Sequence, residues 1–221
     1  MSSRDFQLKN DMRSPFDSLP DEIRSALIRK GWRPGMRRKP RAGWRSCFGM
    51  MKQWFTSQSN EASDDRFIGE FPAATQVLDE LDGIVVAQLR QSSRSKYGLG
   101  CSIYFTRIGR TDELGRLENI LSERLVIIGS TDWHSHITLA ESERMYEYGF
   151  VGEGLYFLGS SFGEGVIRRL MAMKIRPVFL TDSQDPEHEF QLDGLSPDDP
   201  DVLIPSPESG LRDVDTTIYD E

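Results

Sequence analysis

The chain has 221 residues, of which 38% are hydrophobic and 28% charged, and its formal net charge is −8 at neutral pH. This length suffices for one substantial domain with tails, or for two small domains, and the composition is that of a soluble globular protein. No apolar run approaches the roughly 20 residues that a membrane span needs, and the N-terminus lacks the apolar core of a secretory signal, so we expect a cytoplasmic protein without a membrane partner.

The charge is divided unevenly along the chain. Residues 1–54 contain 13 Lys and Arg against 5 Asp and Glu, whereas residues 181–221 contain 1 against 13. Oppositely charged ends attract one another or an outside partner, and salt weakens such exposed contacts. The acidic end fits a basic protein well and nucleic acid poorly.

The N-terminal third begins with residues 1–15, which lack periodicity and are expected to form a flexible tail. A helix is predicted over residues 19–30, with Ser18 and Asp21 suited to its cap and Gly31 to its end. The turn-rich basic segment 31–41 has two interpretations, a solvated loop anchored by Trp32 or a patch that binds phosphate or acidic groups. A second short helix is predicted over residues 44–55.

The middle of the chain predicts helices and short strands. A helix opens at Pro72 and ends at Gly83, and another helical segment lies within residues 107–124. Strands are predicted at 84–89, 101–105, 125–128, 136–140, 145–150, 155–158 and 178–180. The short connections after residue 125 favour an antiparallel meander. Cys47 and Cys101 are too few for a disulfide framework and are expected to be free, buried thiols.

Residues 155–174 predict a strand that leads into a helix covering one face of the sheet. Ser161 and Glu164 have the spacing of a capping box, in which the serine accepts a free amide and the glutamate reaches back to the cap. Phe162, Val166 and Leu170 form one apolar stripe. Ser161 is therefore better explained as a helix cap than as a nucleophile.

These elements predict an α+β fold with an antiparallel-rich central sheet covered by helices, spanning residues 16–180. The acidic segment 181–221 contains five prolines and scattered apolar residues. Too little surface can be buried there to offset backbone ordering, so we expect this tail to be disordered, or ordered only on a partner.

The strongest candidate for a metal or catalytic site is the pair His134 and His136, which would share one face of a strand. Asp132 and Glu141 could complete a site, but a zinc site needs three or four ligands, and His188 falls in the acidic tail. We expect these histidines to be ordinary turn or edge-strand residues, with no metal, cofactor or catalytic residue. No nucleophile elbow or phosphate-binding loop is present, and the basic and aromatic residues near Trp32 match no nucleic-acid-binding module.

Several short motifs in a fixed order resemble the SUKH superfamily of bacterial immunity proteins, and the third subgroup in particular. They cover roughly residues 18–175 and comprise Gly31, Trp32, Pro34, Gly35 and Arg37, then Leu78, Leu81, Gly83 and Val85, then Ile128, Gly129, Ala140, Arg144 and Tyr146, and finally Phe157, Leu158, Gly159, Ser161, Phe162, Glu164 and Leu170. The chain departs from the family pattern at Ser160, Gly163 and Gly165. The two glycines cost about 1 kcal/mol each in a helix relative to alanine.

The resemblance implies a non-catalytic protein that binds and neutralises a toxin delivered between bacteria, often a nuclease or another enzymatic toxin. The acidic chain predicts a basic toxin as the partner. An intracellular scaffold or regulatory module of the same fold is the runner-up, and a metal-dependent hydrolase using His134 and His136 comes third. The partner-binding residues and the oligomeric state do not follow from the sequence.

Overall fold

A computed structural model of the chain describes residues 14–37, 66–90, 101–132, 135–149, 154–180 and 196–216. The helix expected over residues 44–55 lies outside these ranges, as does Cys47. Cys101 is free and buried, as expected.

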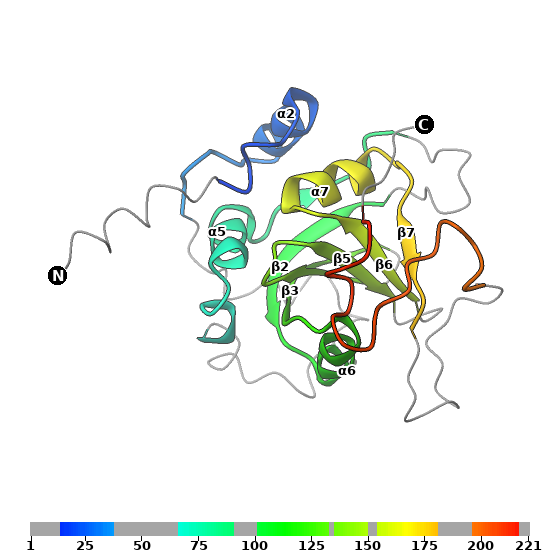
Figure 1. Ribbon diagram of the computed structural model, residues 1–221. Helices are drawn as coiled ribbons and strands as arrows, with labels where there is room; N and C mark the ends of the chain where they lie inside the picture. Colours follow the sequence, from blue (N-terminus) through cyan, green and yellow to red (C-terminus); the bar gives the residue numbers. More distant parts are fainter. Residues whose placement is uncertain are drawn as a thin grey trace, which may run out of the picture.

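A seven-stranded sheet forms the centre of the molecule (Figure 1). Its strands follow one another in chain order, and each neighbouring pair is antiparallel. The strands are β1 (Val85–Val86), β2 (Ile103–Gly109), β3 (Leu125–Thr131), β4 (Ser135–Ala140), β5 (Met145–Gly149), β6 (Gly154–Gly159) and β7 (Arg176–Val178). The α+β fold and the antiparallel meander predicted from the sequence are thus confirmed.

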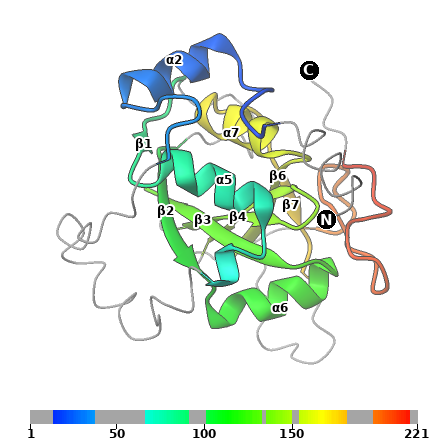
Figure 2. The ribbon, with the colours of Figure 1, turned by 90° about the vertical axis from the view of Figure 1, so that its left-hand side faces the viewer.

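Helices cover both faces of the sheet (Figure 2). They are α2 (Asp21–Arg29), α5 (Pro72–Leu81), α6 (Asp112–Leu121) and α7 (Phe162–Leu170). On β3, Val126 and Ile128 join the core beneath α2, α5 and α7, whereas Leu125 and Ile127 join the core beneath α6. Since successive side chains of a strand point to opposite faces, one continuous apolar run supplies both cores.

Helix α6 is the helical segment predicted within residues 107–124, and it occupies part of that range. Strand β2 continues to Gly109, which pairs with Ile127 of β3 beyond an irregularity in the register. The helix therefore begins only at Asp112. The start of α2 differs from the prediction, because its N-cap is Pro20 and no side chain caps it.

Residues 196–216, called here the C-terminal strap, are packed against the sheet, which differs from the expectation of a disordered acidic tail. Leu203 forms a parallel bridge with Val178 of β7, and its amide donates to the carbonyl of Pro177 at 2.9 Å. Leu203 and Leu211 are 1% and 0% exposed and complete the core beneath α6. The packed part of the chain therefore extends beyond residue 180, although residues 181–195 lie outside the described ranges.

The two glycines in α7 that depart from the family pattern are places of close approach. A Cβ on Gly163 would lie 1.9 Å from Oγ of Ser18, and one on Gly165 would lie 2.7 Å from Cβ of Met145. Glycine at these two positions lowers the helix propensity of α7. Because glycine has no Cβ, however, it allows α7 to lie close to β5 and to the segment before α2.

We predict that Gly165→Ala destabilises the protein by about 1–3 kcal/mol, because overpacking against Met145 outweighs the gain in helix propensity. Gly115→Ala in α6 is the matched control, since its Cβ would meet only the Arg110 side chain at 3.7 Å. The control should stabilise the protein by roughly 0.5–1 kcal/mol. Urea unfolding of both variants checks the pair, and stabilisation by Gly165→Ala would contradict the packing argument.

Candidate binding surfaces

Most of the family-motif residues lie in the core or at turns. Tyr146, Phe157, Leu158, Phe162 and Leu170 are each at most 1% exposed. The motif glycines sit at structural positions: Gly83 follows α5, Gly129 lies in β3, and Gly159 ends β6. Exposed motif residues occur in the loop after α2, namely Gly31, Pro34, Gly35 and Arg37.

Ser161 and Glu164 form a helix cap at the start of α7. The Ser161 hydroxyl accepts from the Glu164 amide at 3.3 Å. The Glu164 carboxylate accepts from the Ser160 amide at 2.8 Å, one residue before the cap position that the sequence predicted, and also from Arg168 Nε at 3.0 Å. The serine oxygen is thus engaged in capping.

Trp32 anchors the loop after α2 to the core. The helix ends in a Schellman motif, in which the amide of Gly31 (φ +91°) donates to Ile28 at 2.9 Å and the amide of Trp32 to Leu27 at 2.9 Å. The Trp32 indole is 1% exposed, and its Nε1 donates to Oε2 of the buried Glu80 in α5 at 2.9 Å. The segment that follows is thereby fixed at its base.

A buried ion pair joins α7 to the sheet. Arg169 Nε lies 2.5 Å from Oε2 of Glu147, and Arg169 Nη2 donates to Glu147 Oε1 at 2.7 Å. Ser135 also donates to this carboxylate, and its hydroxyl lies 2.5 Å from that of Thr131. Both charged groups are buried and paired with each other, so this cluster orients the helix and is typical of a structural ion pair.

A second buried carboxylate fastens the end of α6 to the β4–β5 turn. Glu123 accepts from the Tyr146 hydroxyl at 2.6 Å and from Ser142, and Arg144 lies 3.7 Å away. Burial raises the pKa of Tyr146, and the neighbouring Glu123 raises it further. Tyr146 is therefore a neutral hydrogen-bond donor at physiological pH.

The histidine pair singled out in the sequence is not assembled into a described site. His136 is buried in β4, and burial lowers its pKa to about 4. His134 lies outside the described residues. Within the described ranges, no group of three or more His, Cys, Asp and Glu side chains could hold a metal ion.

A shallow groove of about 290 Å³ lies between the start of α5 and the β4–β5 turn. Its lining is apolar and acidic, with Phe71, Pro72 and Ala74 on one side and Glu141 and Glu143 on the other. Beside it, Arg124 pairs with Glu70 and Glu141 and stacks over Phe71 at 5.0 Å. Paired surface charges of this kind suit binding more than chemistry.

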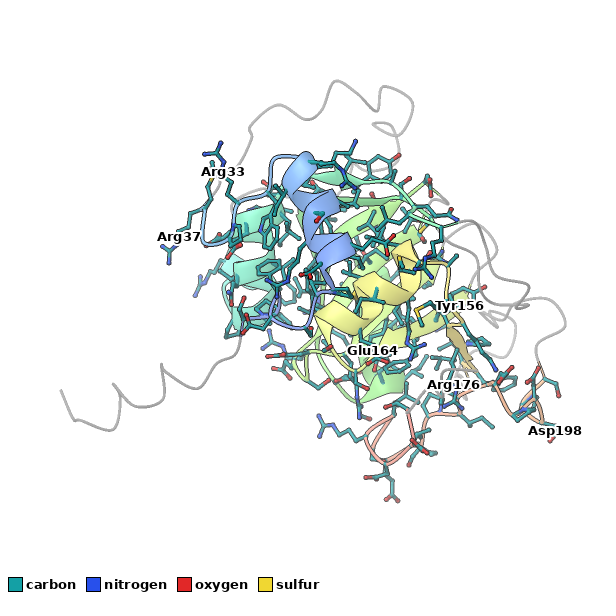
Figure 3. All side chains as sticks on the ribbon, turned by 90° about the horizontal axis from the view of Figure 1, so that it is seen from above. Arg33, Arg37, Tyr156, Glu164, Arg176 and Asp198 are labelled. Carbon is teal, nitrogen blue, oxygen red and sulfur yellow. The ribbon has the colours of Figure 1, made fainter. Side chains whose placement is uncertain are left out.

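The strap presents an acidic surface. It contains six Asp and Glu against one Arg. Arg176 of β7 holds it by donating to the carbonyls of Asp201 at 3.2 Å, Asp215 at 2.9 Å and Pro200 at 3.4 Å. Lys174 pairs with Asp201 at 2.6 Å. Figure 3 shows Arg176 beside the strap and Asp198 pointing outward from it. Sequence reasoning missed this clamp, because no periodic pattern links residues 174–176 with 200–215.

A family model described as SUKH-3 immunity protein matches residues 19–171. The chain belongs to the SUKH-3 immunity protein family. This confirms the resemblance to the SUKH superfamily and gives the chain an immunity role in general. Neither a curated protein nor a solved structure matches the chain.

The SUKH-3 match ends within the turn after α7, so β7 and the strap lie outside it. The core beneath α2, α5 and α7 is built almost entirely from matched residues, whereas the opposite core also takes Leu203 and Leu211 from the strap. No helix in the described part of the chain has the length and apolar character that a membrane crossing requires.

The buried histidine predicts a pH dependence of stability. His136 titrates near 6.5 when unfolded and near 4 when folded, so the unfolded chain binds more protons between these values. Stability should therefore fall by about 3 kcal/mol as the pH drops from 7 to 4. Urea unfolding of the wild type and of His136→Gln across this pH range checks the prediction, because the variant should lack the part of the pH dependence that comes from His136. Parallel profiles for the two proteins would contradict the assignment.

The clamp predicts that Arg176→Ala loosens the strap while the sheet stays folded. Removing three hydrogen bonds from a charged donor should raise hydrogen exchange at the amides of Leu203 and Phe179 by roughly tenfold or more, read by mass spectrometry. Arg66→Ala, an exposed arginine outside the strap, is the control. Unchanged exchange in Arg176→Ala would show that Leu203 and Leu211 hold the strap without the clamp.

Proposed function

We propose that this SUKH-3 protein is a non-catalytic immunity protein that binds and neutralises a cognate polymorphic toxin in the cytoplasm. The family match over residues 19–171 carries the proposal. The polar clusters described above support it, because each charged or hydroxyl group in them is engaged in capping, pairing or core packing. The protein would then act through an interface.

We further propose that the toxin presents a basic surface, as a nuclease does toward its nucleic-acid substrate. The net charge of −8 and the excess of carboxylates on the strap support this. Complementary charge accelerates encounter, and an interface of about 800 Å² per partner can reach nanomolar affinity, or about −12 kcal/mol, if it contains a few well-packed anchors.

Co-expression with a toxin candidate from the adjacent genes tests the function. We expect restored growth and a stable complex with a Kd in the nanomolar range, since neutralising a lethal enzyme needs tight binding. Growth arrest with no complex would count against an immunity role and favour a scaffold or regulatory module of the same fold.

The charge of the partner is tested with a neutralised strap, Asp198→Asn/Glu208→Gln/Asp213→Asn. At low salt, its association rate with the toxin should fall by roughly tenfold, with a smaller change in the dissociation rate. Asp17→Asn/Asp21→Asn/Glu22→Gln changes the net charge equally at exposed positions away from the strap. Equal slowing in both triple variants would assign the effect to net charge alone.

A further inference from the structure

The last residues of α2 and the loop after it present a surface of opposite sign to the net charge of the protein. Of residues 28–37, all but Trp32 are exposed. This stretch, called here the basic loop, contains Arg29, Lys30, Arg33 and Arg37 and no acidic residue. Figure 3 shows Arg33 and Arg37 pointing away from the body of the protein, whereas Asp198 of the strap lies at the opposite end of the same view.

Apolar side chains accompany the cations of the basic loop. Among the described residues, the exposed large hydrophobic side chains are Ile28 at 54%, Met36 at 47% and Ile204 at 44%, and two of these three belong to the basic loop. Arginine, methionine and aromatic residues are enriched in protein interfaces, whereas lysine and glutamate are depleted. The combination fits a protein surface better than a solvated turn.

Hydrogen bonds fix the base and the turn of the basic loop. The Schellman motif and the Trp32–Glu80 hydrogen bond fix its base, and the Met36 amide donates to the Arg33 carbonyl at 3.0 Å. Among the described residues, Arg37 forms a distant ion pair with Asp79, at 4.0 Å, and its side chain remains 89% exposed. A preorganised loop loses little conformational freedom on binding, so its exposed side chains can contribute most of their contact energy.

We infer that the basic loop is a second docking surface, which takes an acidic protein segment bearing an apolar side chain. Its guanidinium groups would pair with carboxylates, and Met36 and Ile28 would cover the apolar side chain. The basic loop would repel the basic toxin surface that the strap attracts. The partner of the basic loop is therefore a different protein from the toxin, and the inference goes beyond the proposed function. Nucleic acid is a poorer fit, because the chain as a whole is acidic and the apolar side chains would find no partner on a phosphate backbone.

Fluorescence anisotropy on the full chain tests the inference with three labelled probes. They are a peptide in which glutamate alternates with leucine and phenylalanine, the same peptide with serine at the apolar positions, and a DNA duplex. We expect the first peptide to bind, the serine peptide to bind about tenfold more weakly, and the duplex not to bind. Binding of the duplex alone, or of none of the three probes, would overturn the inference.

Two variants assign binding to the basic loop. Arg33→Glu/Arg37→Glu should weaken the first peptide by at least tenfold, and Met36→Ser should weaken it severalfold without changing the serine peptide. Arg66→Glu/Arg90→Glu makes the same charge change at exposed arginines elsewhere and should have little effect. If both double variants lost affinity for the first peptide equally, the effect would come from net charge alone, and the inference would be overturned.

Toxin rescue in the same variants separates the two surfaces. Arg33→Glu/Arg37→Glu should still restore growth, because the toxin is assigned to the acidic side of the molecule. Loss of rescue in a folded variant would place the toxin on the basic loop and overturn its assignment to a separate partner. Failure of rescue by the wild type would instead count against the immunity function, whatever the peptides show.

Discussion

Both faces of the central sheet are buried, and this constraint determines most of the remaining structure. An antiparallel sheet usually leaves one face to solvent, and its strands then alternate between apolar and polar residues. Here Leu125–Ile128 is apolar on both faces, because α5 and α7 cover one side and α6 and the strap cover the other. The polar side chains that face these cores, such as Glu147 and Glu123, are accordingly paired. Covering both faces therefore accounts for the buried ion pairs as well as for the packed strap.

Local sequence signals predicted the described helices, most of the strands and the order of the meander. The Ser161 hydroxyl accepts from the Glu164 amide as their spacing predicts, whereas the Glu164 carboxylate accepts from the Ser160 amide instead of the Ser161 amide. The strap could not be found in this way, because Leu203 and Leu211 follow no helical or strand period and pack against residues that are distant in the sequence. Gly165 shows the same limit. From the sequence, this glycine only lowers the helix propensity, whereas in the structure a side chain there would collide with Met145, which lies twenty positions away in the sequence.

The candidate surfaces were predictable to different degrees. The sequence left two interpretations open for the segment around Trp32, a loop anchored by the tryptophan and a patch that binds phosphate or acidic groups. In the structure Trp32 is buried, as the first interpretation requires, and the basic side chains are exposed, as the second requires. The acidic charge was evident from composition, but its location on a clamped surface depends on Arg176, whose contacts span up to 39 positions. Opposite charges that could have neutralised one another in a flexible chain are thus held at opposite ends of a folded one.

The strap also changes what the edges of the sheet offer to other chains. An exposed edge strand presents unpaired backbone groups, onto which a strand of another molecule can add. In the described part of the chain, one edge is β1, which has two residues, and the other is β7, which has three and already accepts Leu203. Edges as short as these offer an added strand few backbone groups to pair with, which disfavours strand-to-strand aggregation.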